Sequence, residues 1–121
     1  MIELRKKITA KLRAIHPRVY FQDAPDSAQT PYIVYDLPNS YTNEEQEIVA
    51  LDVNVWDIGV DTTAIETITS AVWNHLHKYR YIDGDIQFSI YRSNRLPPID
   101  EDRNILRRMM IFEVRYFDRR I

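Results

Sequence analysis

Residues 48–57 read IVALDVNVWD and form the most regular pattern in the chain. Polar Asp52 and Asn54 alternate with four apolar side chains, Val49, Leu51, Val53 and Val55. Successive side chains of a strand point to opposite faces of its sheet, so a period of two predicts a strand with one buried face. This strand is the starting point for placing the rest of the chain.

A helix is predicted on each side of this strand. The first ends before Pro17, because the residue before a proline is disfavoured in helical conformation. Its apolar positions are Ile2, Leu4, Ile8, Leu12 and Ile15, with lysines and arginines opposite. The second is capped by Asp61 or Thr62 and extends to about Tyr79. Its apolar positions are Ile65, Ile68, Val72 and Leu76.

Four more strands are expected from β-branched, aromatic or alternating runs, near residues 19–21, 32–37, 86–91 and 106–116. Three polar or proline-containing segments are expected to be irregular: residues 22–31, 38–47 (an exposed hairpin tip or mobile loop) and 93–104. The short connections favour an α+β fold. We expect a mainly antiparallel β-sheet of four to five strands with two amphipathic helices packed on one face, in a single domain over residues 1–121. No internal sequence repeat is visible.

Composition restricts the class of protein. The chain has 121 residues, of which 45% are hydrophobic and 28% charged, values typical of a compact globular domain. It contains no cysteine, which excludes disulfides, a thiolate nucleophile and cysteine-based metal sites. No apolar run approaches the length of a membrane helix, and the charged opening residues do not resemble a signal peptide, so we expect no membrane partner and a cytoplasmic location.

Most catalytic and cofactor-binding motifs are excluded. Gly59 and Gly84 are the only glycines, too few for a Walker loop or a dinucleotide fingerprint. No serine lies between the glycines of a nucleophile elbow, and His75 and His77 would point to different sides of a helix. We therefore expect no catalytic, metal-binding or cofactor-binding residues, no cofactor and no enzymatic activity.

Two carboxylate clusters leave one enzymatic alternative open. They comprise Glu44, Glu45 and Glu47, and Asp100, Glu101 and Asp102. Paired acids can perform acid–base chemistry or bind a cation when they converge in a pocket. Both clusters fall in segments expected to be exposed, which favours solvated loop charge.

Charge is distributed unevenly along the chain. The net charge is −2, but six bases and one acid give residues 1–18 a charge of +5, while nine acids and no base give residues 19–61 a charge of −9. Residues 62–91 have a net charge of −1, and eight arginines against five acids give residues 92–121 a charge of +3. These segments either neutralise each other within one domain or form opposite faces that favour head-to-tail association.

The second interpretation defines a candidate protein interface. It combines cations of the first helix with the two charged loops: Arg5, Lys7, Lys11, Asn43, Glu44, Glu45, Asp100, Glu101, Asp102 and Arg103.

Several short segments occur in a characteristic order. They are residues 18–20 (RVY), 24–25 (AP), 31–35 (PYIVY), 51–56 (LDVNVW) before an amphipathic helix, and 112–116 (FEVRY). In this order and spacing the chain resembles the tail-completion, or tail-terminator, proteins of long-tailed bacteriophages and prophages. The resemblance covers nearly the whole chain.

The resemblance implies a non-enzymatic virion protein at the tail–head junction, present in the host bacterial cytoplasm before assembly. Such proteins form a ring, commonly a hexamer, that stops tail polymerisation. The implied partners are copies of the chain itself, the major tail tube protein and the head connector or stopper protein. DNA would pass through the ring without specific recognition of nucleic acid.

Two other functions remain open. One is another phage neck or head-completion protein of similar size. The other is a small nucleic-acid-binding domain that uses the basic first helix, which steeply salt-dependent DNA binding would reveal.

Overall fold

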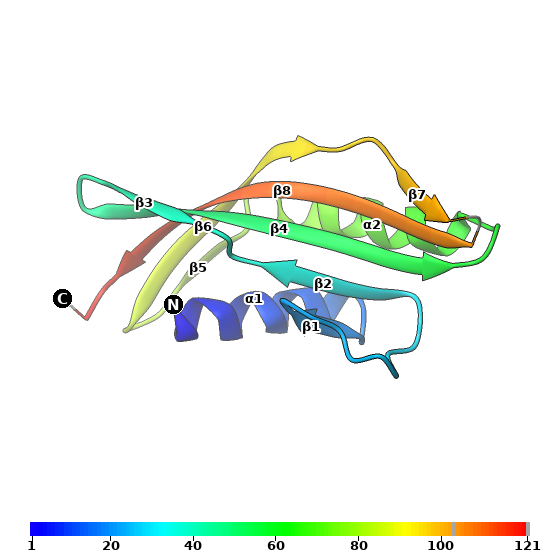
Figure 1. Ribbon diagram of the computed structural model, residues 1–121. Helices are drawn as coiled ribbons and strands as arrows, with labels where there is room; N and C mark the ends of the chain where they lie inside the picture. Colours follow the sequence, from blue (N-terminus) through cyan, green and yellow to red (C-terminus); the bar gives the residue numbers. More distant parts are fainter. Residues whose placement is uncertain (103, 121) are drawn as a thin grey trace.

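The computed structural model describes residues 1–102 and 104–120, with the backbone alone described for residues 99–102. Two helices, α1 (Ile2–Ile15) and α2 (Thr63–Leu76), accompany one curled β-sheet (Figure 1). The predicted α+β class is confirmed, and α1 ends before Pro17 as expected.

The main path of the sheet runs in the order β1-β2-β4-β8-β6-β5. Two short strands are paired beside this path, β3 with β4 and β7 with β8. All pairs in the described residues are antiparallel except β1 with β2, which is parallel. The strands are β1 (Val19–Phe21), β2 (Tyr32–Asp36), β3 (Ser40–Asn43), β4 (Gln46–Ile58), β5 (Arg80–Ile82), β6 (Ile86–Arg95), β7 (Ile99–Asp102) and β8 (Ile105–Asp118). The mainly antiparallel sheet is confirmed, with more strands than the expected four to five.

The centre of the sheet is the pair β4 and β8. Its register extends from Glu47 opposite Tyr116 to Ile58 opposite Ile105. The alternating residues 48–57 therefore lie in a strand with neighbours on both sides, and their odd-numbered apolar side chains are buried. The sequence pattern correctly identified the strand on which the sheet is built.

The outer strand of each long hairpin is interrupted. Asp36 pairs with Asp52 and Ser40 with Val49, so the three residues between β2 and β3 lie opposite only two residues of β4. The exposed hairpin tip expected over residues 38–47 is confirmed, but the segment is not irregular throughout, because residues 40–43 form β3. The loop expected over residues 93–104 is wrong, because β6 continues to Arg95 and β7 follows at Ile99. Both strands pair with β8, whose residues 105–118 provide a long edge. Pro97 and Pro98 therefore interrupt the pairing only at the break between β6 and β7.

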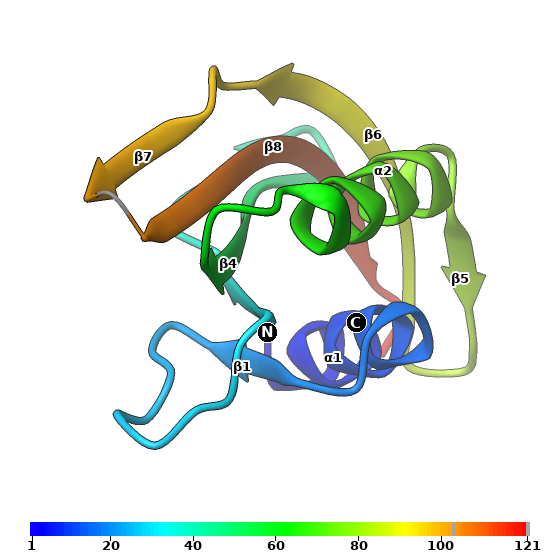
Figure 2. The same cartoon turned by 90° about the vertical axis from the view of Figure 1, so that its right-hand side faces the viewer.

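Both helices lie on the concave side of the curled sheet (Figure 2). Their buried side chains are Leu4, Ile8 and Leu12 of α1 and Ile65, Thr69, Val72 and Leu76 of α2. In Figure 2, α1 lies between the edge strands β1 and β5, and α2 packs against β4, β6 and β8. The buried side chains of the two helices and of the sheet thus form a single hydrophobic core.

Two details of the helices differ from expectation. Helix α2 ends at Leu76 instead of about Tyr79, because Lys78 adopts a φ of 65° and turns the chain into β5. Thr62 occupies the N-cap position without a side-chain cap bond, while the Asp61 carboxylate accepts a hydrogen bond from the Thr63 amide at 2.9 Å. Neither helix in the described residues is long and apolar enough to cross a membrane.

The order of elements repeats although the sequence does not. Each half of the chain contains a 14-residue helix, a three-residue strand, an interrupted strand and a long strand. From one edge of the sheet to its centre the order is β1, β2, β4, and from the other edge to the centre it is β5, β6, β8. The two edges of the sheet are therefore formed by corresponding strands of the two halves.

Candidate protein-interaction surfaces

The three predicted interface cations of α1 lie against aromatic rings of the sheet edges. The Arg5 guanidinium is 4.8 Å from the Phe21 ring centroid, on β1. The Lys7 ammonium is 5.1 Å from the ring of Tyr81, on β5, and the Lys11 ammonium is 4.3 Å from the ring of Tyr79. A hydrogen bond with the Tyr81 side chain is the main reason that the pKa of Lys7 is raised. These cation–π contacts attach α1 to both edges, so Lys7 and Lys11 are only partly free to bind another molecule.

The acidic part of the predicted interface lies at the tip of the β3–β4 hairpin. Asn43, Glu44 and Glu45 are exposed there, and Glu44 has a φ of 57°, which the tight turn requires. The Ser40 hydroxyl donates a hydrogen bond to Glu47 at 2.9 Å, across the hairpin. Figure 1 shows the hairpin reaching beyond the helices, so its charge is available to a partner.

The third part of the predicted interface comprises Asp100, Glu101, Asp102 and Arg103, whose side chains are not described. The backbone of Asp100, Glu101 and Asp102 belongs to β7. Their side chains, and the whole of Arg103, lie outside the described residues.

Ion pairs within the described residues do not connect the basic segment 1–18 to the acidic segment 19–61. Lys6 pairs with Glu3 in the same helix at 3.6 Å, and Arg108 pairs with Glu66 of α2 at 2.6 Å. The remaining pairs join Arg115 to Glu113 and Arg120 to Asp118. Direct neutralisation between the two segments is thus absent from the part of the chain that is described.

Charge is instead divided across the width of the sheet. The strands β1 to β4 and their connections lie within residues 19–61, which hold nine acids and no base. The strands β5 to β8 and their connections lie within residues 80–118, where seven acids balance seven arginines. Six of these arginines lie on β5, β6 and β8: Arg80, Arg92, Arg95, Arg107, Arg108 and Arg115. This division was missed in the sequence, because only the strand order shows that these arginines share one side of the sheet. The eight arginines spread over residues 92–121 were the available signal.

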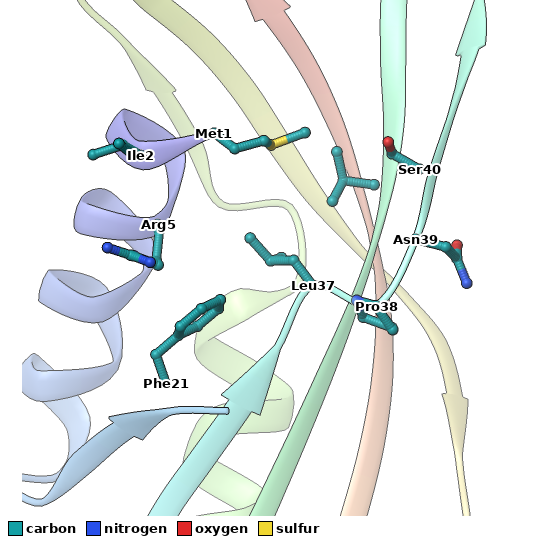
Figure 3. Close-up of a pocket in the computed structure, with 9 residues that line it drawn as sticks. Met1, Ile2, Arg5, Phe21, Leu37, Pro38, Asn39 and Ser40 are labelled. Atoms are coloured by element: carbon teal, nitrogen blue, oxygen red, sulfur yellow. The ribbon is translucent and has the colours of Figure 1, made fainter. Parts of the chain in front are cut away.

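An open groove lies between the N-terminus of α1 and the break after β2 (Figure 3). It has a volume of about 360 Å³. Its lining is mostly apolar: Met1, Ile2, Phe21, Leu37, Pro38 and Val49, with Arg5, Asn39 and Ser40. The groove exists because β1 stops at Phe21 and Gln22, with a φ of 67°, turns the chain away from β2. Ile2, expected on the buried stripe of α1, is 61% exposed beside it.

The opposite edge of the sheet is β5. Arg80 and Ile82 are exposed there, whereas Tyr81 turns toward α1 and Phe88. Ile82 is 60% exposed and lines a shallow pocket with Gln87 and Phe117. Neither Arg80 nor Ile82 was singled out from the sequence, since a three-residue strand gives too short a pattern to assign its faces.

Among the buried or partly buried polar side chains are Asp52 in the sheet and Thr69 in α2. Burial raises the pKa of Asp52, and the charge of Asp36, its cross-strand neighbour, raises it further. The hydroxyl of Thr69 is buried and lacks a hydrogen-bond partner among the described residues. Groups of three or more histidine or acidic side chains arranged to hold a metal ion are absent from the described side chains, which leave out residues 99–103 and 121.

No family model and no curated protein matches this chain. Its surfaces are therefore interpreted from their own geometry. Two features stand out: a sheet with one acidic and one arginine-rich side, and an apolar groove at the acidic edge.

Proposed function

We propose that this protein is a non-enzymatic, ring-forming structural component of a phage or prophage tail, of the tail-terminator type. The observation that carries the proposal is the division of charge between the two sides of one sheet. The order of the segments RVY, AP, PYIVY, LDVNVW and FEVRY supports the same assignment through its resemblance to that family.

Divided charge favours one kind of self-association. Two acidic sides repel each other, whereas an acidic side attracts the arginines of the other side. Copies would therefore meet head to tail, through different surfaces on the two partners. Such contacts produce a closed ring when the rotation between neighbours closes, and an open filament when it does not.

The role in the virion follows from a ring. A ring, commonly of six copies, would sit on the head-proximal end of the tail tube, stop further polymerisation and bind the head connector. Its partners would be the major tail tube protein and the connector or stopper protein. DNA would pass through the central opening, and the ring would be located at the tail–head junction after assembly in the bacterial cytoplasm.

The test is assembly with and without tail tubes. The purified chain is studied by sedimentation velocity and negative-stain microscopy, alone and with tubes assembled from the major tail protein of the same genome. We expect rings, either free or capping one end of the tubes. A chain that stays monomeric and leaves the tubes uncapped would contradict the proposal.

The same experiment distinguishes a tail terminator from a head-completion protein. Portal or connector complexes from the same genome serve as the second binding target. Binding to these complexes with no binding to tubes would favour a head-completion protein over a tail terminator.

A further inference from the structure

The β3 strand has an open backbone edge. The Ala50 amide donates a hydrogen bond to the carbonyl of Asn39, at 2.9 Å, across the β3–β4 hairpin. Backbone groups alternate between the two sides of a strand, so Tyr41 and Asn43 also face β4, while the groups of Ser40 and Thr42 point away from it. Strand β1, which covers this side of β2, ends before it reaches β3.

The β5 strand has a second open edge. The Ile90 amide donates to the carbonyl of Tyr79, and the Asp83 amide donates to the carbonyl of Ile86, both at 2.9 Å. By the same alternation Tyr81 faces β6, and the backbone groups of Arg80 and Ile82 point away from the sheet. Each edge therefore offers the backbone of two residues to a new strand.

We propose that β5 of one copy pairs with β3 of the next copy, which makes the β-sheet continuous from one copy to the next. In this antiparallel pairing Ile82 lies opposite Ser40 of the neighbouring copy, and Arg80 lies opposite Thr42. The inference rests on the proposed ring and specifies the contact that builds it. Strand addition of this kind takes its affinity from backbone hydrogen bonds and its specificity from alternate side chains.

The side chains at the two edges are complementary in this register. Paired residues of adjacent strands share a face of the sheet, so Ile82 projects to the side of Ser40. Ser40 lines the apolar groove with Met1, Leu37 and Val49. The groove therefore offers an apolar site for a side chain that is 60% exposed in the single copy.

Charge supports the same register. Thr42 is paired with Glu47 on its other side, and Glu44 and Glu45 form the adjacent turn. Arg80 placed opposite Thr42 lies among these three carboxylates. An exposed arginine and an acidic hairpin thus meet at one end of the contact, and the apolar groups meet at the other.

Charge also excludes the two symmetric alternatives. Pairing β3 with β3 brings two sets of Glu44, Glu45 and Glu47 together, and pairing β5 with β5 brings two Arg80 side chains together. Like charges placed side by side disfavour both pairings. The mixed pairing leaves one β3 and one β5 edge open in every dimer, so association continues until the ring closes.

The test uses single cysteines, because the chain has none of its own. Two full-length variants, Ser40→Cys and Ile82→Cys, are mixed in equal amounts in a glutathione redox buffer. A disulfide between residues 40 and 82 can then form only between copies. We expect it at about tenfold or more above the control, since contact raises the effective thiol concentration to the millimolar range. The control replaces Ile82→Cys by Ser27→Cys, in the exposed segment between β1 and β2.

The outcomes are read by mass spectrometry of the linked peptides. Links between residues 40 and 82 support the contact. Their absence, or links joining only like positions, overturns it. Sedimentation velocity of the wild-type chain separates this failure from that of the proposed function: rings without the link refute only the strand pairing, whereas a chain that is monomeric with and without tail tubes refutes the ring.

Discussion

The two halves of the molecule share an order of elements but differ at the edges that they contribute to the sheet. In the first half, residues 22–31 lead from β1 back to the start of β2, so the two strands are parallel. In the second half, residues 83–85 form a tight turn, and β5 and β6 are antiparallel. Together with the divided charge, this difference gives one framework two unlike edges. Unlike edges are what head-to-tail association requires.

The largest expected effect comes from the core that the two halves share. Phe112 of β8 and Leu51 of β4 face each other in the central ladder, and both are buried. Phe112→Ala should lower the free energy of unfolding by about 3–5 kcal/mol, and Leu51→Ala by about 2–5 kcal/mol. Urea denaturation followed by circular dichroism measures both. The control is Ile111→Ala, at the half-buried neighbouring position, which should cost less. Two separate unfolding transitions would show that the halves do not form one core.

A smaller difference is expected between the helices. Ile8 and Thr69 each occupy the seventh position of a 14-residue helix and face the core, but the Thr69 hydroxyl lacks a partner among the described residues. Thr69→Val should stabilise the protein by about 1 kcal/mol, because an unsatisfied buried polar group is removed. The matched change Ile8→Thr should destabilise it by about 1–3 kcal/mol. Thermal unfolding of the two variants checks the signs. A destabilising Thr69→Val would indicate that the hydroxyl is satisfied.

Low pH should act on the tight turn of the second half. The Asp83 carboxylate accepts hydrogen bonds from the Ile86 amide, the Tyr81 hydroxyl and the Asp85 amide. These bonds lower the pKa of Asp83 from 3.8 to about 2. A lowered carboxyl pKa stabilises the fold above the unfolded value, and this contribution is lost as the pH falls from about 4 to about 2. Asp83→Asn should therefore show a shallower loss of stability over that range. Equal slopes for variant and wild type would contradict this role.

In the first half, the contribution of Asp52 to stability should change with pH in the opposite direction. Burial, together with the charge of Asp36, raises the pKa of Asp52. Asp52 therefore favours folding most when protonated, and stability is lost as the pH rises from the unfolded value through the folded one. Asp52→Asn should stabilise the protein at pH 7 and change little at acidic pH, by an amount smaller than that of the core variants. Urea denaturation of the variant and the wild type at both pH values tests this. A stability difference between variant and wild type that is the same at both pH values would refute it.

The sequence allowed prediction of the parts of the fold that local patterns determine. The alternation of residues 48–57 placed β4, and Pro17 placed the end of α1. The short strands β3, β5 and β7 were missed, because three or four residues carry too little periodicity and are held by their neighbours in the sheet. Prolines in residues 93–104 suggested a loop, although β8 supplied a pairing edge on both sides of the break.

The candidate interface was only partly accessible from the sequence. Asn43, Glu44 and Glu45 could be placed at an exposed tip, since a polar run between two strands predicts one. Lys7 and Lys11 were expected to be free, but their contacts with Tyr81 and Tyr79 depend on α1 lying beside β5. The groove and the exposed Ile82 depend on where β1 stops and on strand order, which pairing over long sequence separations determines.

The central claim is that unlike, oppositely charged edges join the copies. Its most direct test is sedimentation velocity at low ionic strength on two charge-reversed variants, Arg80→Glu and the double variant Glu45→Arg with Glu47→Arg. Alone, each variant presents two edges of like charge and should remain monomeric where the wild type assembles. An equimolar mixture pairs every edge with one of opposite charge and should restore assemblies of the wild-type size. Variants that assemble alone, or a mixture that stays monomeric, would contradict the claim.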